Sequence, residues 1–129
     1  MVITHQGTIL IIEDNPGFRF CYKAVLEADG YTVLEAEDGE QGWEMTKDKT
    51  PELILLDLML PKLHGFEVLK KIRAHSTTKS IPVVILTVLE DPKERAKGIM
   101  LGANDYFIKG SDSPKHIVKM AVGVLAKAR

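Results

Sequence analysis

Short runs of apolar residues recur along the chain and predict the strands of a buried sheet. Three of them are almost unbroken: Thr8–Ile12, Leu53–Leu56 and Val83–Leu86. A strand exposed on one face alternates apolar and polar residues, whereas a strand covered on both faces does not. We therefore expect these three runs to be central parallel strands. Two shorter and more mixed runs, Tyr31–Leu34 and Tyr106–Ile108, fit strands nearer the edges.

Apolar residues between these runs follow helical spacing and predict amphipathic helices. The first such helix precedes Gly30, a stop signal, and has an apolar face made of Phe18, Cys21, Tyr22, Val25 and Leu26. Two later segments are expected to cover the sheet with Ala96, Ile99, Met100 and Ala103, and with Ile117, Met120, Ala121, Val124 and Leu125. The segment from Phe66 to Ala74 predicts a further helix. The segment from Asp38 to Lys47 is the weakest, because its periodicity is poor and it contains Gly42.

Strand and helix patterns alternate five times, which predicts an α/β fold. Right-handed crossovers place helices on both faces of a doubly wound, five-stranded parallel sheet. The pattern does not specify the order of the strands. A chain of 129 residues, 45% of them apolar, has room for one domain with a substantial core. We expect a short N-terminal tail, 1–7, followed by one domain, 8–129.

Composition excludes several classes of function. The 17 Lys and Arg against 18 Asp and Glu give a net charge of -1, so no electrostatic case exists for binding nucleic acid or an anionic membrane. No signal-like segment and no run of about 18 apolar residues is present, so no membrane span is expected. Cys21, the single cysteine, fits a reducing compartment, and we expect a cytoplasmic protein. The four histidines lack the spacing of zinc ligands.

Polar residues that follow the apolar runs are the candidates for chemistry, because ligands of open parallel sheets bind beyond the carboxyl ends of the strands. These residues are Glu13, Asp14, Asp57, Thr87 and Lys109. Any one of them alone is an ordinary loop residue. Five of them at successive strand ends favour a functional site.

The residue types indicate phosphoryl chemistry. Three clustered carboxylates repel one another unless a cation lies among them, and hard oxygen ligands favour Mg²⁺. Mg²⁺ typically takes one or two carboxylates together with a phosphate oxygen. The Thr87 hydroxyl can donate to one phosphoryl oxygen and the Lys109 ammonium can neutralise another. Asp57 is then the nucleophile that forms an acyl phosphate.

Longer motifs surround these residues, and with them the chain resembles the receiver domains of bacterial-type two-component response regulators, including the chemotaxis regulators. The resemblance covers essentially the whole chain from about Thr8. The matching stretches are Ile11–Asp14, Asp38–Gly39, Leu55–Pro61 with Gly65, Ile85–Thr87, Gly102–Ala103 and Tyr106–Lys109.

This resemblance implies a flavodoxin-like strand order, 2-1-3-4-5, and phosphorylation of Asp57 by a sensor histidine kinase or a histidine phosphotransfer protein. It implies that Mg²⁺ is bound by Glu13, Asp14, Asp57 and the backbone carbonyl of Met59. It also implies that Thr87 and Tyr106 form a coupled switch, in which the hydroxyl moves toward the phosphoryl group while the ring turns inward. The result is a signalling domain that changes its surface for a downstream protein, not a metabolic enzyme.

Three positions depart from the family pattern. Glu13 stands where the family usually has a second Asp, Val88 where it has a small residue, and Gly110 where it has a proline. The longer Glu13 carboxylate affects metal affinity, the Val88 methyl groups narrow access to the site, and the loop at Gly110 is expected to be looser. All the reactive groups remain, so we expect a competent receiver with altered kinetics.

Three other functions stay open at this point. One is a degenerate receiver that binds proteins without phosphorylation. The second is a Mg²⁺-dependent phosphohydrolase that uses Asp57, although such enzymes of the haloacid dehalogenase type carry a second Asp two residues later, where this chain has Met59. The third is a flavodoxin-like nucleotide-binding protein, which Asp14–Pro16 disfavours because it is no Gly-rich loop. No output domain follows Arg129, which predicts either a stand-alone receiver or a piece of a longer protein.

Overall fold

The computed structural model describes residues 6–128, in which five strands alternate with five helices. Residues 1–5 of the predicted tail, 1–7, lie outside the described residues, as does Arg129. The elements in chain order are β1 (Thr8–Ile12), α1 (Pro16–Ala28), β2 (Thr32–Ala36), α2 (Gly39–Lys49), β3 (Leu53–Leu56), α3 (Gly65–Ala74), β4 (Val83–Thr87), α4 (Pro92–Met100), β5 (Asp105–Ile108) and α5 (Pro114–Ala128).

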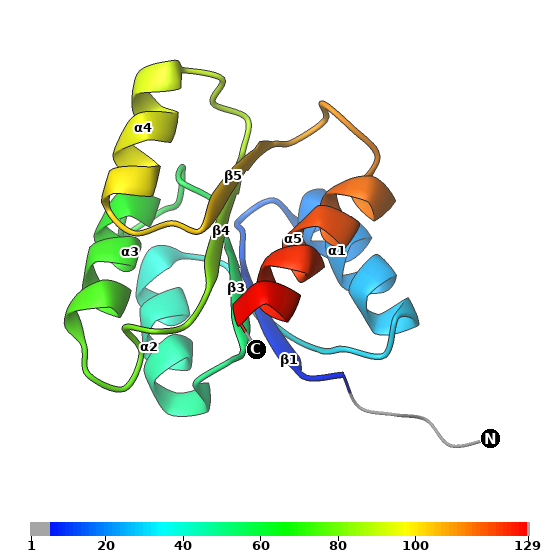
Figure 1. The fold of residues 1–129 in the computed structure, drawn as a ribbon, viewed down its shortest axis with the longest axis horizontal. Helices are drawn as coiled ribbons and strands as arrows, with labels where there is room; N and C mark the ends of the chain where they lie inside the picture. Colours follow the sequence, from blue (N-terminus) through cyan, green and yellow to red (C-terminus); the bar gives the residue numbers. More distant parts are fainter. Residues whose placement is uncertain (1–5, 129) are drawn as a thin grey trace.

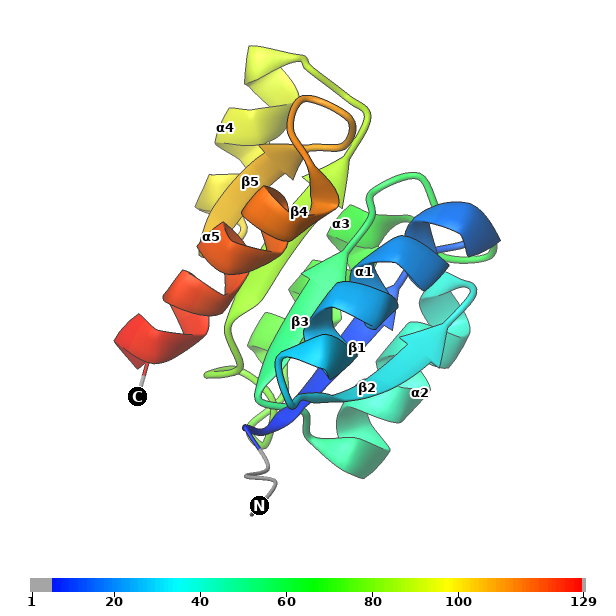
Figure 2. The same cartoon turned by 90° about the vertical axis from the view of Figure 1, so that its right-hand side faces the viewer.

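All five strands are parallel and lie in the order β2-β1-β3-β4-β5, which confirms the predicted fold. Helices α1 and α5 cover one face of the sheet, and α2, α3 and α4 cover the other (Figures 1 and 2). The two mixed runs are the edge strands, as expected. Strand β2 extends to Ala36, beyond the predicted end at Leu34, because Ala36 still pairs with Ile12 of β1.

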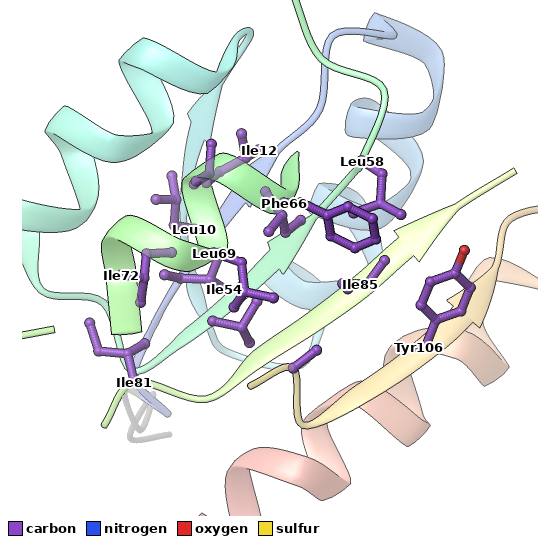
Figure 3. Packing of buried hydrophobic residues seen from close by; sticks show 14 of the residues in the cluster. Leu10, Ile12, Ile54, Leu58, Phe66, Leu69, Ile72, Ile81, Ile85 and Tyr106 are labelled. Carbon is purple, nitrogen blue, oxygen red and sulfur yellow. The ribbon is translucent and has the colours of Figure 1, made fainter. Parts of the chain in front are cut away.

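Two hydrophobic clusters, one on each face of the sheet, form the core. Neighbouring residues of a strand point to opposite faces, so Ile9 and Ile11 pack under α1 and α5, whereas Leu10 and Ile12 pack under α2 and α3. The second of these clusters is drawn in Figure 3. Strands β3 and β4 are buried along their whole length, and β1 is buried from Ile9 to Ile12, which explains their unbroken apolar sequence.

Of the four residues predicted for the apolar face of α4, only Ala103, which lies just beyond the helix, is buried. Ala96 is exposed, and Ile99 and Met100 are 44% and 87% exposed. The buried residue of this helix is Gly98, where an added Cβ would lie 2.7 Å from Cδ1 of Ile85. The helix backbone thus approaches β4 through a position without a side chain, and an apolar periodicity cannot reveal such a contact.

Helix α1 departs from the prediction at one residue. Cys21 is exposed, although it was expected on the apolar face with Tyr22 and Leu26, which are buried. No helix within residues 6–128 is long and apolar enough to cross a membrane.

Candidate functional site

The carboxyl ends of β1, β3 and β5 bring four charged side chains together. The backbone N–H of Asp57 donates to the carbonyl of Ile12 at 3.0 Å, which fixes the start of the loop after β3 beside the end of β1. Glu13, Asp57 and Lys109 are only 3%, 6% and 8% exposed, whereas Asp14 is exposed. Charged groups this deeply buried are stable only when paired.

Lys109 supplies that pairing for two carboxylates. Its Nζ lies 2.9 Å from Oδ2 of Asp57 and also contacts Oε1 of Glu13. The second oxygen of Glu13 accepts a hydrogen bond from the N–H of Asn15 at 3.1 Å. Burial, together with the nearby Asp57 charge, raises the pKa of Glu13 to about 7, although the hydrogen bonds from Lys109 and Asn15 oppose the rise. Burial therefore disfavours the charged Glu13 carboxylate more than Lys109 and Asn15 favour it.

A cluster of carboxylate oxygens that could hold a metal ion lies in the same pocket. One carboxylate oxygen each of Glu13, Asp14 and Asp57 lies within 4.8 Å of the other two. Such a set of hard oxygen donors fits Mg²⁺. The Met59 side chain is 55% exposed, and its N–H lies 3.4 Å from Oδ1 of Asp57, so only its backbone adjoins the cluster.

Thr87 ends β4 with a fully buried hydroxyl. Its Oγ1 is the one buried side-chain polar atom within residues 6–128 that has no hydrogen-bond partner. A buried hydroxyl without a partner costs about 1–3 kcal/mol, so proteins rarely keep one without a use. The backbone carbonyl of Thr87 accepts from the N–H of Lys109 at 2.8 Å, which ties the ends of β4 and β5 together.

Tyr106 on β5 is 1% exposed and is held by two contacts. Its hydroxyl donates to the carbonyl of Leu89 at 2.8 Å, and its own carbonyl accepts from Nη1 of Arg95 at 2.8 Å. The Arg95 guanidinium also lies over the ring, 5.8 Å from its centroid. Figure 3 shows the ring at one end of the core cluster. The contacts of Arg95 and Leu89 with Tyr106 were not predicted from the sequence, because no local pattern marks a contact between segments this far apart.

A comparison with known proteins agrees with this geometry. The family model described as the response regulator receiver domain matches residues 9–121. The chain belongs to that family. Among its relatives, the phosphate regulon transcriptional regulatory protein PhoB of Escherichia coli is 37% identical over 119 residues, which cover 92% of this chain and 52% of PhoB. This receiver therefore spans about half the length of that relative.

Solved structures show the same receiver fold. A two-component response regulator of the LuxR family from Aurantimonas sp. SI85-9A1 has a TM-score of 0.85 and 29% identity, and the match covers 95% of this chain and 87% of that one. The Mn²⁺-bound form of response regulator Rcp1 has a TM-score of 0.79 and 30% identity, over 92% of this chain and 91% of that one. These matches identify a domain of signalling proteins.

The three departures from the family pattern occupy different places in this receiver. Glu13 lies inside the pocket, where its length lets it reach Lys109. Val88 directly follows Thr87 and is 54% exposed. Gly110 has φ of +80°, a conformation closed to proline and strained for other L residues.

Arg19 is a further site residue that the sequence analysis missed. Its Nη1 donates to the backbone carbonyl of Glu13 at 2.8 Å, and its Nε pairs with Glu35 of β2 at 3.1 Å. The guanidinium therefore fixes the loop that carries Glu13 and Asp14. The sequence gives no signal for this pairing, since it depends on α1 lying against β2.

Proposed function

We propose that this domain, 8–129 after the tail 1–7, accepts a phosphoryl group on Asp57 from a phosphohistidine of a sensor histidine kinase or a histidine phosphotransfer protein. One observation carries the proposal: the buried Asp57 carboxylate is paired with Lys109 at 2.9 Å inside a cluster of two further carboxylates. A surface carboxylate in a loop needs neither a buried lysine nor a cation beside it. A nucleophile that receives an anionic group needs positive charge beside it, which Lys109 and a cation held by the carboxylates would supply.

The covalent step is a simple displacement. A carboxylate oxygen of Asp57 forms a bond to phosphorus while the bond from phosphorus to the imidazole nitrogen of the donor breaks, and the imidazole, which carries a proton on its other ring nitrogen, leaves as a neutral histidine. In a second step, water attacks phosphorus while the bond from phosphorus to the Asp57 oxygen breaks, and inorganic phosphate and the free carboxylate result. Lys109 stays beside the reacting oxygens in both steps and compensates their negative charge.

Glu13, Asp14, Asp57 and the backbone carbonyl of Met59 would hold the metal ion, which we assign as Mg²⁺. The three carboxylate oxygens within 4.8 Å of one another support this assignment. The Mn²⁺-bound Rcp1, at 30% identity, also supports a divalent ion in this fold. When bound, the ion neutralises carboxylate and phosphoryl charge and so favours transfer.

Thr87 and Tyr106 are the groups through which phosphorylation would change the surface. The unpartnered Thr87 hydroxyl can donate to a phosphoryl oxygen on Asp57. The Tyr106 ring already lies inward, where its hydroxyl donates a hydrogen bond to the backbone carbonyl of Leu89. We infer that the phosphoryl group strengthens this inward arrangement by drawing Thr87 toward Asp57, which alters the loop that carries Leu89.

The outcome is a changed docking surface for a downstream protein. PhoB is named as a transcriptional regulatory protein, and the matched residues cover 52% of its length. With a net charge of -1, the domain itself is not expected to contact nucleic acid or a membrane. A cytoplasmic location stays a prediction.

The test is intact-protein mass spectrometry after incubation with acetyl phosphate, with Mg²⁺ or with EDTA. We expect the wild-type chain to gain the mass of one phosphoryl group only when Mg²⁺ is present, and Asp57→Asn to gain none, because the amide is not a nucleophile toward phosphorus. A purified phosphotransfer protein, phosphorylated on histidine, serves as a second donor.

Two outcomes would contradict the proposal. An adduct that persists in Asp57→Asn would place the phosphoryl group on another residue. No adduct with either donor, while Mg²⁺ still binds, would favour a degenerate receiver that acts by protein contact alone.

A further inference from the structure

The ring of Phe18 lies against the ammonium group of Lys109. The Nζ of Lys109 is 4.5 Å from the ring centroid, inside the range of a cation–π contact. The Lys109 side chain is only 3% exposed, so little water competes for its charge. Cation–π contacts are stronger when the cation is desolvated.

Phe18 is itself held in place. Its N–H donates to the side chain of Asn15, which caps α1, at 3.0 Å, so its backbone is fixed in the first turn of the helix. Its ring stacks on that of Tyr22, with the centroids 6.2 Å apart and the planes 10° apart, and Tyr22 is 1% exposed. A rigid aromatic surface therefore faces the lysine.

The three neighbours of the ammonium leave it little freedom. A lysine carries three N–H donors, and the carboxylates of Glu13 and Asp57 accept two of them. The Phe18 ring lies close to the same nitrogen. Without the ring, the ammonium loses one of these three neighbours, and the long lysine side chain gains freedom to move away from Asp57.

We propose that Phe18 is a positioning residue, which holds the Lys109 ammonium beside Asp57 while a phosphoryl group is transferred to or from it. This inference rests on the proposed phosphorylation of Asp57. Phe18 contacts neither the donor nor the acceptor oxygen in this account; it acts through Lys109. Both transfer to Asp57 and hydrolysis of the acyl phosphate use the lysine, so both depend on the ring.

The direction of the two rate changes separates positioning from simple shielding. In Phe18→Leu the apolar bulk remains but the π face is lost, and we expect adduct formation from acetyl phosphate and hydrolysis of the adduct to slow together by about tenfold. In Phe18→Tyr the π face remains, and both rates should stay within about twofold of wild type. A residue that only kept water and donor out would give the opposite result, with both rates rising in Phe18→Leu.

Two controls sharpen the measurement. Phe20 lies two residues along the same helix and is 71% exposed, so Phe20→Leu should leave both rates unchanged. In a Lys109→Ala background, Phe18→Leu should have no further effect, because residues that act through one another are not additive. If the effects of the two substitutions add in this double variant, the proposal is overturned.

Proton NMR tests the contact between the Phe18 ring and Lys109 without any measurement of phosphoryl transfer. An aromatic ring shifts nearby protons upfield, so the Lys109 ε-methylene resonances should be displaced in wild type and in Phe18→Tyr and should return to ordinary values in Phe18→Leu. Phe18→Met provides a second apolar variant if Phe18→Leu does not fold. If the wild-type chain forms no adduct at all, the proposed function and this inference are both overturned. If the wild-type chain forms the adduct and Phe18→Leu reacts at the same rates, only the inference is overturned.

Discussion

At the scale of single residues, the buried hydroxyl of Thr87 predicts a conflict between stability and function. Oγ1 of Thr87 has no partner among the described residues, so it lowers stability while it is available to a phosphoryl oxygen. Thr87→Val keeps the shape and removes the unpaired group. We expect the variant to raise the free energy of unfolding by about 1 kcal/mol in urea titrations, and to weaken the response to phosphorylation.

Thr78 provides the matched control for this substitution. It is also fully buried, but its Oγ1 donates to the carbonyl of Ile72 at 2.7 Å. Thr78→Val leaves that carbonyl without this donor and should lower the free energy of unfolding by about 1–2 kcal/mol. The same chemical change is therefore expected to have opposite signs at the two positions. Equal destabilisation by both would mean that the Thr87 hydroxyl is satisfied in solution.

The sequence predicts which residues gather at the site, but it does not predict how their side chains pair. Asp57 and Lys109 could be placed together because each follows a parallel strand, and such strands end at one edge of the sheet. Their pairing at 2.9 Å depends on side-chain rotamers, which a spacing does not encode. The same is true of the missing partner of Thr87 and of the Arg95 contact with Tyr106.

At the scale of elements, helix α2 shows how a glycine that weakens a helix can still be required. Gly42 lies where a Cβ would approach Cδ1 and Cγ2 of Ile12 at 2.7 and 2.8 Å. Ile12 is fully buried in β1 and, being β-branched, cannot easily turn aside. The glycine therefore lets α2 lie close against the sheet.

Gly42→Ala should consequently destabilise the fold. Alanine favours the helix by up to about 1 kcal/mol, but overpacking against Ile12 costs about 1–3 kcal/mol. Gly123 of α5 is the matched control, since nothing lies within 4 Å of its added Cβ. Gly123→Ala should raise the free energy of unfolding by about 0.5–1 kcal/mol, as measured by thermal or urea unfolding. Stabilisation by both alanines would show that Ile12 moves aside without cost.

The elements that the sequence predicted well are those whose side chains do the packing. Helices α1 and α5 present Tyr22, Leu26 and Ile117 to the sheet, so their periodicity is visible. Helix α4 packs through Gly98, and its exposed Ile99 and Met100 misled the prediction of its face. A close approach of backbone to sheet leaves no apolar periodicity to read.

At the scale of the whole molecule, the strand order converts five separate loops into one site. Alternating strands and helices predict a parallel sheet but not which strands are neighbours, because pairing is a contact between segments distant in sequence. The resemblance to receiver domains provided the order, and the structure confirms it. With β1 between β2 and β3, the loop that carries Glu13 and Asp14 lies beside the loop that begins at Asp57.

This arrangement couples metal binding to the stability of the whole domain. The three carboxylates come from loops after two different strands, so the site exists only in the folded chain. A ligand that binds only the folded state at one hundred times its Kd adds about 2.7 kcal/mol to the free energy of unfolding. For a domain of this size, that predicts a rise in Tm of about 10 °C on replacing EDTA by saturating Mg²⁺.

Asp14→Asn removes one ligand charge at the exposed side of the cluster and should abolish most of this rise, whereas Asp48→Asn, at an exposed carboxylate of α2, should preserve it. Calorimetry of the three chains in EDTA and in Mg²⁺ measures the difference. Because both substitutions remove one negative charge, a general effect of net charge on Mg²⁺ binding would lower the rise equally in both. A rise that survives intact in Asp14→Asn would place the ion elsewhere, and phosphoryl transfer to Asp57 would then depend on Lys109 as the cation beside it.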